Sequence, residues 1–386
     1  MRLLFRERPS LRVGSMLRVD FRLKLQGDFR VVPSGVETEE GLFDMNRRRV
    51  GIQGTFLRHF EYELERELRQ KRVWRDAFVN FRYVDNVQIR AGKFKIPFSQ
   101  EQLTGPTDLD FISRAKATDS LSPARDVGVT VHGRVGRRAI GYDVGVFRHD
   151  GENARFSFNP GAERTVAARV TARPLRLTPA SGGTRELELA VAATAGTIPE
   201  GLNSLRGRTA FRQPFFEPVY VKGRRLRVGM DADWRPGPFS LKGEFVRVRD
   251  ERRNQGLFDE DLPPLVAQGW YLSGTWALTG EPKLEGLEPR RPLFRGGVGA
   301  VELAARYERL AFDSSLDGEP ELTNPRAANL LEASDRAWTF GVTWYLNHWT
   351  KIQVNAIREQ LADADRSPVP DRARFWTHVC RLQFVL

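Results

Sequence analysis

The sequence contains little that could form a disulfide, a metal site or a membrane-spanning helix. Its single cysteine, Cys380, excludes a disulfide within the chain. The five histidines show no HxxxH spacing and there is no CxxC motif, so we expect no metal site and no cofactor. No apolar run approaches the roughly 18 residues that a membrane helix needs. These absences leave a strand-rich fold as the main way for such a chain to enter a membrane.

Positive charge is abundant. Lysine and arginine number 61 against 49 acidic residues, which gives a net charge of +12 over 386 residues. Such a balance suggests phosphate, nucleic acid or an anionic lipid surface as a partner. The length would suit two or three soluble domains, but a single large β domain can also be this long. The mean hydropathy is below zero, as in a membrane barrel, where only every second residue faces lipid.

Apolar and polar residues alternate along much of the chain. From residue 11 to 26 one face carries seven apolar residues and the other six polar ones, and only Ser15 and Met16 break the pattern. A period of two predicts a strand, because a helix would scatter both sets around its circumference. The alternation recurs and predicts about sixteen strands, beginning near residues 11, 43, 59, 74, 87, 125, 139, 165, 186, 225, 239, 269, 299, 337, 350 and 374.

The connections differ in length in a regular way. Those after odd-numbered strands are mostly long: 27–42, 94–124, 148–164, 195–224, 248–268, 310–336 and 358–373. Those after even-numbered strands are mostly short, at 54–58, 134–138, 235–238 and 347–349. Three connections are exceptions: 174–185 and 279–298 follow even-numbered strands but are long, and 66–73 follows an odd-numbered strand but is short. Long loops at one end and tight turns at the other are typical of outer-membrane barrels. We therefore predict an all-β fold, a transmembrane antiparallel β-barrel at 11–386 with an N-terminal extension at 1–10.

Closing such strands would turn their polar faces inward around a water-filled lumen. Charged residues on a pore wall can select ions. We expect the following arginines on the wall: Arg18, Arg22, Arg82, Arg90, Arg169 and Arg227. Carboxylates such as Glu61, Glu63 and Glu65 share this face, so a solvated wall of mixed pairs is the alternative for most positions.

Two stretches stand out as candidate anion sites. Arg47 and Arg49 share one strand face, with Arg48 on the other, and arginine offers bidentate donors to oxyanions. The pair could grip a phosphate-like group or form a basic strand end outside the membrane. The longest connection, 94–124, carries apolar anchors such as Phe98 and Phe111. It could fold into the lumen, bringing Lys95 and Arg114 near the path, or pack on itself or on a neighbouring subunit.

Several motifs resemble those of the phosphate-selective porins O and P, a Gram-negative outer-membrane family. The resemblance is specific over 43–150 and rests on residues 47–54, 76–81, 92–98 with Glu101, and 125–129. It implies a sixteen-stranded homotrimeric porin whose long third loop folds into the lumen. It also implies an anion path or constriction at Arg47, Arg48, Arg49, Lys93, Lys95, Arg114 and Arg125.

The chain departs from the family pattern in two places. Residues 101–110 contain no lysine and include Asp108 and Asp110, whereas phosphate-binding members carry further lysine there. Family barrels usually end on an aromatic residue, whereas this chain ends on Leu386 with Phe384 two positions earlier. The first departure favours general anion preference over a tight phosphate site.

From these features we expect passive uptake of small anions, with phosphate or polyphosphate as candidates, through an outer membrane of bilayer and lipopolysaccharide. A general-diffusion porin of weak selectivity is the alternative. A barrel enzyme is disfavoured because there is no Gly-x-Ser-x-Gly motif. Nucleic-acid binding is disfavoured because the arginines are spread among acids rather than gathered in a block. The N-terminus lacks the apolar core of an export signal, so either the sequence is a mature or truncated form or the barrel interpretation is wrong.

Overall fold

A computed structural model describes residues 2–5, 8–36, 43–69, 74–152, 164–176, 185–216, 218–283, 286–314 and 333–386. Almost all regular structure in these residues is antiparallel strand. No helix among them is long and apolar enough to cross a membrane. The strands are β1 (Arg2–Phe5), β2 (Pro9–Val13), β3 (Leu17–Val31), β4 (Phe43–Phe56), β5 (Phe60–Glu67), β6 (Trp74–Val84), β7 (Val87–Lys95), β8 (Arg125–Val135), β9 (Ile140–Phe147), β10 (Thr165–Ala172), β11 (Arg185–Leu202), β12 (Tyr220–Pro236), β13 (Phe239–Arg252), β14 (Leu262–Ala277), β15 (Ala300–Ser314), β16 (Ala333–Tyr345), β17 (Thr350–Leu361) and β18 (Arg374–Val385). The helices are α1 (Gln100–Leu103), α2 (Lys116–Leu121) and the 3-10 turn η2 (Pro174–Arg176).

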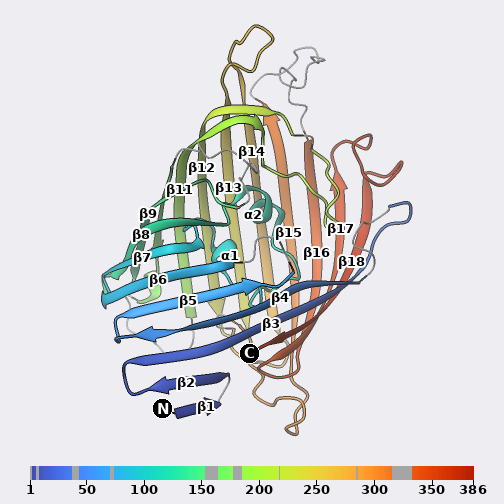
Figure 1. The fold of residues 1–386 in the computed structure, drawn as a ribbon. Helices are drawn as coiled ribbons and strands as arrows, with labels where there is room; N and C mark the ends of the chain where they lie inside the picture. Colours follow the sequence, from blue (N-terminus) through green and yellow to red (C-terminus); the bar gives the residue numbers. More distant parts are fainter. Residues whose placement is uncertain are drawn as a thin grey trace.

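Strands β3 to β18 form a closed ring (Figure 1). Each pairs with the next along the chain, and β18 pairs back with β3 over His378↔Val31 to Val385↔Lys24. The ring therefore contains sixteen antiparallel strands, which confirms the predicted barrel and strand number. All main-chain groups along the strands can then pair within the sheet, as a lipid environment requires.

The start of the barrel differs from the prediction. We expected one strand beginning at Leu11, but the chain turns at 14–16, where Gly14 has a φ of 55°. Ser15 and Met16, which had broken the alternation, lie in this turn. The segment before the turn becomes β2, which pairs with the first part of β3, and β1 pairs in turn with β2.

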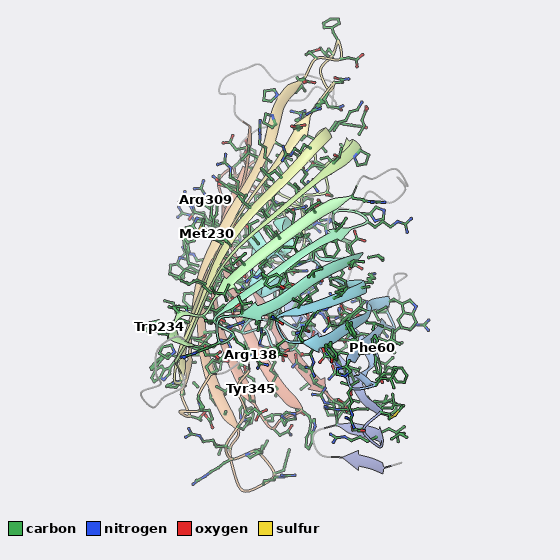
Figure 2. All side chains as sticks on the ribbon, turned by 90° about the vertical axis from the view of Figure 1, so that its left-hand side faces the viewer. Phe60, Arg138, Met230, Trp234, Arg309 and Tyr345 are labelled. Atoms are coloured by element: carbon green, nitrogen blue, oxygen red, sulfur yellow. The ribbon has the colours of Figure 1, made fainter. Side chains whose placement is uncertain are left out.

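The two faces of the ring differ as the alternation predicted. On β8, Val127, Val129 and Val131 are 45%, 50% and 40% exposed, while Asp126 and Thr130 at the alternate positions are buried inside. Met230 and Trp234 of β12 are likewise exposed on the outer surface (Figure 2). The barrel thus presents an apolar surface outward and a polar one inward.

Several long strands extend further than predicted. β11 continues to Leu202 and β13 to Arg252, although we placed the connections from 195 and 248. The reason lies in the inward residues near these strand ends: Ile198, Val246 and Val248 are apolar and buried. On β13 the exposed residues beside these valines are Arg247 and Arg249, so the apolar face turns inward and the alternation reverses its phase although the strand goes on. Parts of the expected connections, at 37–42, 70–73, 153–163, 177–184, 284–285 and 315–332, lie outside the described residues.

The interior is not filled by water alone. An apolar cluster gathers inward side chains of β12 to β15 together with residues of the 203–219 connection. Phe216 stacks on Phe312 with ring centroids 4.1 Å apart, and Phe211 packs edge-on against Phe375. We expected an aqueous lumen without a packed core, so this cluster corrects that expectation: it leaves less of the interior open to solutes.

The ring is also uneven in height. β5, β9 and β10 have 8 residues each, whereas β11 has 18 and β12 has 17. One side of the barrel, here called the low wall and made of β5 to β10, is therefore shorter than the other (Figure 1).

Candidate functional site

The connection between β7 and β8, residues 96–124, contacts the polar faces of strands far along the sheet. Ser99 Oγ donates to Glu244 Oε2 of β13 at 2.7 Å. Lys116 is paired with Asp335 of β16 and Glu359 of β17. Arg381 of β18 donates to the carbonyl oxygen of Ile112 at 2.7 Å. Figure 1 shows α1 and α2 of this segment within the outline of the ring.

Side-chain charges hold the segment in place. Asp110 accepts from Lys242 and Lys283, each 2.7 Å from one of its carboxylate oxygens. Burial alone would raise the pKa of the Asp110 carboxyl, but the two ammonium groups hold it below its ordinary value. Glu101 is also buried, and burial raises the pKa of its carboxyl although Arg306 lies 3.5 Å away.

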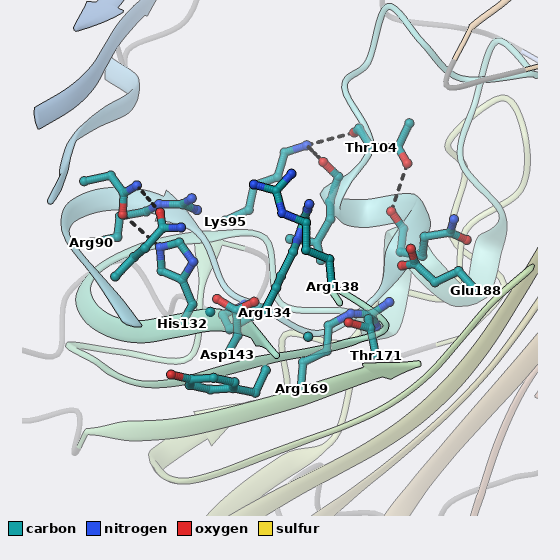
Figure 3. A pocket seen from close by; sticks show the side chains of 18 of the residues that line it. Arg90, Lys95, Thr104, His132, Arg134, Arg138, Asp143, Arg169, Thr171 and Glu188 are labelled. Carbon is teal, nitrogen blue, oxygen red and sulfur yellow. Dashed lines mark hydrogen bonds between the residues drawn. The ribbon is translucent and has the colours of Figure 1, made fainter. Parts of the chain in front are cut away.

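A first cavity of about 680 Å³ lies between the 96–124 segment and the short turns (Figure 3). Its walls are the polar faces of strands on the low wall and beyond. Cations outnumber carboxylates here. The cations are Arg82, Arg90, Lys95, Arg134, Arg138, Arg169, Arg173, Arg235 and Lys242, and the carboxylates are Glu61, Asp85, Asp108, Asp143 and Glu188.

A second cavity of about 410 Å³ lies between the same segment and the 203–219 connection. Cations again outnumber carboxylates. The cations are Arg47, Arg114, Lys116, Arg206, Arg208, Arg212 and Arg306, and the carboxylates are Asp119, Glu152 and Glu308.

One main-chain carbonyl links the two cavities. The carbonyl oxygen of Thr104 accepts from Lys95 Nζ, which lines the first cavity, at 2.8 Å. It also accepts from a terminal guanidinium nitrogen of Arg114, which lines the second cavity, at 2.8 Å. The Thr104 carbonyl is therefore shared by one cation from the lining of each cavity.

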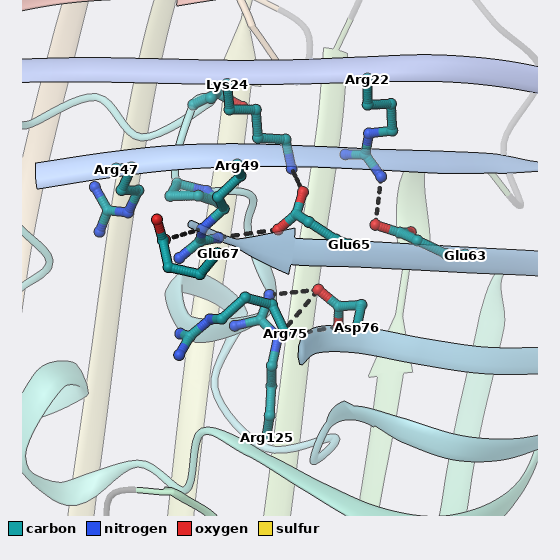
Figure 4. A network of polar contacts seen from close by, with 12 residues as sticks. Arg22, Lys24, Arg47, Arg49, Glu63, Glu65, Glu67, Arg75, Asp76 and Arg125 are labelled. Atoms are coloured by element: carbon teal, nitrogen blue, oxygen red, sulfur yellow. Dashed lines mark hydrogen bonds and ion pairs between the residues drawn. The ribbon is translucent and has the colours of Figure 1, made fainter. Parts of the chain in front are cut away.

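Most predicted site cations are neutralised by a carboxylate. Arg49 is paired with Glu65 and Glu67 at 3.0 and 2.7 Å, and Arg22 with Glu63 (Figure 4). The remaining pairs are Arg18–Asp20, Arg82–Glu61, Lys93–Glu152, Arg125–Asp76, Arg169–Asp231 and Arg227–Asp150. A paired cation adds little net charge to the path of a passing ion.

Four other predicted cations contact neutral groups instead. Arg47 donates to the side-chain oxygen of Gln26, and Lys95 and Arg114 donate to main-chain carbonyls. The guanidinium of Arg90 lies 5.0 Å from the ring centroid of Phe78. None of the four has an ion-pair partner among the described residues. We call Arg47, Arg90, Lys95 and Arg114 the unpaired cations.

Arg48 lies apart from this set. Its side chain is exposed, whereas Arg47 and Arg49 on either side point to the interior. The alternation of β4 had predicted this separation, and Arg48 does not line either cavity.

Some cavity residues had no signal in the sequence. Arg206, Arg208 and Arg212 belong to the 203–219 connection, where no alternation predicts a face. Lys116 lies in α2, and Arg134 and Arg138 lie at a short turn. A group of three or more His, Cys, Asp or Glu able to hold a metal is absent from the part of the chain that the structure describes.

Comparison with known proteins gives a family and a set of similar folds. The model of the family described as phosphate-selective porin O and P matches residues 19–386. No curated protein sequence is significantly similar.

Among solved structures, an anion-selective porin from Comamonas acidovorans aligns with a TM-score of 0.57, 12% identity, and coverage of 95% of this chain and 99% of that one. The outer membrane channel DcaP of Acinetobacter baumannii aligns with a TM-score of 0.58 and 11% identity, and the alignment covers 97% of this chain and 99% of that one. The trimer form of Vibrio cholerae OmpT aligns with a TM-score of 0.55 and 9% identity, and the alignment covers 95% of this chain and 99% of that one. At such identities the likeness shows the fold alone.

Proposed function

The chain belongs to the phosphate-selective porin O and P family and is an outer-membrane porin, and we propose that its channel passes small anions in preference to cations. The excess of cationic over acidic side chains around both interior cavities carries this proposal. Charge on a pore wall sets which ions enter, and it acts strongly where the lumen is narrow. The fold and family point to a channel rather than an enzyme, and to the outer membrane of a Gram-negative bacterium.

The proposed path runs along the unpaired cations. An anion entering the second cavity would meet Arg47 and Arg114, pass the Thr104 carbonyl, and reach Lys95 and Arg90 in the first cavity. The contacts of the 96–124 segment with β13 to β18 support a segment folded into the lumen, where it forms the constriction. Arg48 is left out of this path because its side chain lies on the outer face.

The preferred substrates in this proposal are small anions in general, with phosphate as one of them. Residues 101–110 contain no lysine. The charge of Asp110 is offset by Lys242 and Lys283, so this carboxylate does not repel anions as its sequence position suggested. The neutralised pairs along β3 and β5, such as Arg22–Glu63, favour the alternative of a general-diffusion porin. The unpaired cations favour anion preference.

The proposed assembly is a homotrimer in a bilayer containing lipopolysaccharide. Family resemblance and the trimer form of the Vibrio cholerae structure support this arrangement.

Reconstitution of the purified protein in a planar bilayer tests the function. In a chloride gradient we expect stepwise currents and a reversal potential set by the anion. Added phosphate that blocks the chloride current would indicate a phosphate site, and anion preference without block would indicate a general anion pore. Equal permeability to both ions would contradict the proposal.

A further inference from the structure

The outer face of the taller side of the barrel is hollowed where its outward side chains are small. The hollow, here called the outer groove, extends over β12 to β17, has a volume of about 780 Å³ and is lined mostly by apolar residues. Gly274 of β14 and Ala305 of β15 lie opposite each other in the middle of it, between Leu241 of β13 and Phe340 of β16 in the same row. A Cβ atom on Gly274 would meet nothing closer than 3.7 Å, so the backbone does not require glycine there. The sequence therefore leaves open a space that ordinary side chains could fill.

The outer groove lies close to the end of the barrel where the short turns are. Along β15, Ala305 is four residues from Val301, which pairs with Trp344 of β16. At about 3.4 Å per residue this is about 14 Å along the strand, within half of the roughly 30 Å hydrocarbon thickness of a bilayer. The indole N–H of Trp344 donates to the carbonyl oxygen of Val298 at 2.8 Å. Tryptophan is typical of the boundary between acyl chains and headgroups, so the groove lies in the half of the membrane on the short-turn side.

Positive charge gathers just beyond this boundary, in the connection between β14 and β15. Arg290, Arg291 and Arg295 are exposed in a turn at 290–298, here called the basic turn, at the end of the barrel where the short turns lie (Figure 1). The main-chain N–H of Leu293 donates to the carbonyl oxygen of Leu346 at 2.7 Å and ties the turn to the end of β16. The basic turn is therefore fixed beside the lower end of the outer groove.

The basic turn itself contains no acidic residue. The acids of the connection precede it: Glu281 accepts from the hydroxyl of Thr279, and Glu288 lies 3.3 Å from His348. Glu285 lies outside the described residues, and within those described none of the three arginines has an ion pair. A pairing of Glu285 with one of them would still leave two guanidinium groups for a ligand.

The tip of the basic turn is apolar and exposed. Phe294 is 87% exposed and Val298 70% exposed. Phe294 has a φ of 68°, a left-handed conformation that is uncommon for a bulky side chain. Apolar and aromatic side chains next to arginine suit a membrane interface, where the apolar side chains enter the acyl region and the guanidinium groups reach the phosphates.

We propose that the basic turn and the outer groove together bind one anionic phospholipid, with its phosphate on Arg291 and Arg295 and one acyl chain in the groove. Guanidinium groups hold phosphate through paired, charge-assisted hydrogen bonds. Because the short turns of such barrels face the periplasm, the lipid belongs to the periplasmic leaflet. The site lies on the opposite side of the wall from the ion path. It rests on the placement of the porin in an outer membrane and not on its ion preference.

Native mass spectrometry of the purified oligomer with added dioleoylphosphatidylglycerol tests the headgroup contact. We expect R291Q/R295Q to bind this lipid at least about tenfold more weakly than the wild type, because the charge-assisted hydrogen bonds to phosphate are lost. The control R58Q/R137Q removes two exposed arginines from other short turns and should bind the lipid as the wild type does.

Filling the outer groove tests the acyl-chain contact. A305L should weaken binding about threefold or more, because the leucine side chain takes the space in which the acyl chain makes its contacts. The control A193L adds the same side chain to the exposed outer face of β11, outside the groove, and should not change binding. Heat-modifiable migration on a gel, with unchanged conductance and reversal potential, would show that each variant is folded and that its channel is intact. Failure of this proposal can then be told apart from failure of the proposed ion preference.

Three results would overturn the proposal. Equal binding of the lipid by R291Q/R295Q and wild type would exclude the basic turn as the headgroup site. Equal binding by A305L and A193L would exclude the outer groove as the acyl-chain site. Complete displacement of the lipid by millimolar inorganic phosphate would identify a site for the free ion instead.

Discussion

Neutralising three of the unpaired cations should reduce the anion preference of the channel. The variant R47Q/K95Q/R114Q removes positive charge without leaving a buried carboxylate unpaired, because the three side chains donate to Gln26 and to main-chain carbonyls. Glutamine keeps a donor at each position. The segment 96–124 keeps its ion pairs to the strands, because those of Asp110 and Lys116 involve none of the three substituted residues.

The size of the effect follows from Coulomb's law. A unit charge 4 Å from a passing anion contributes about 1 kcal/mol even at the dielectric constant of bulk water. At the Thr104 carbonyl at least two cations, Lys95 and Arg114, act together, which gives about 2 kcal/mol. Since every 1.4 kcal/mol is tenfold, we expect the anion permeability to fall roughly 30-fold, and the ratio of anion to cation permeability to fall at least as much because the cation is no longer repelled. The measurement belongs at about 0.1 M salt, where the Debye length is about 10 Å.

Reversal potentials across a planar bilayer in a potassium chloride gradient measure this ratio. The control R22Q/E63Q removes a neutral ion pair from the wall and should leave the ratio unchanged. If a folded triple variant kept the wild-type reversal potential, the assignment of the path to the unpaired cations would be refuted.

Three further substitutions test the contacts that hold the barrel wall, the 96–124 segment and the 203–219 connection in place. R49Q should lower the temperature at which the barrel unfolds on a heat-modifiability gel, because it leaves buried Glu65 without one of its cations; losing one partner of a buried pair costs about 3–5 kcal/mol. D110N should make the open-channel current noisier at pH 7 by freeing the 96–124 segment. The pKa of Asp110 is lowered in the folded protein, so its ion pairs persist above about pH 4 and weaken only as the pH falls further; the wild type should therefore become noisy only under acid conditions. F216A should raise single-channel conductance without changing selectivity, because loss of the stack on Phe312 removes about 3–5 kcal/mol of packing from the 203–219 connection.

The barrel could be predicted because one periodicity governs most of the wall. Sixteen segments of alternation gave the sixteen strands of the ring, with β4, β6, β7 and β8 beginning at the predicted residues. The prediction of a strand end failed where the alternation reverses its phase, as on β13, where Val246 and Val248 are buried and Arg247 is exposed. It also failed at Gly14, where a tight turn divides a run that otherwise alternates. In both cases a local structural requirement overrides the pattern that identifies the rest.

The faces of the site residues were predictable, but their net charges were not. Alternation placed Arg47 and Arg49 inside and Arg48 outside, as the structure has them. Whether an inward cation is neutralised depends on which acidic side chains the register brings within reach, on the next strand as for Arg49 or across one strand as for Arg22 and Arg125. Arg49 lies opposite Glu67, whereas Arg47 lies opposite Gln26. Counting charges along the sequence treats these two arginines alike, although only Arg47 adds net charge to the lumen.

Register therefore gives the inner wall two kinds of cation with different roles. A paired cation such as Arg125 of β8, held by Asp76 of β6 at 2.7 Å, connects two strands across β7 and resists displacement. An unpaired cation such as Lys95 is fixed by carbonyl oxygens, which orient it without cancelling its charge. A lumen with only paired cations would be rigid but would carry no net positive charge. In a lumen with only unpaired cations, the cationic side chains would repel one another. Under the proposed function, anion selectivity depends on a few residues whose partners are neutral, and these are the positions where we expect substitution to change permeation before it changes stability.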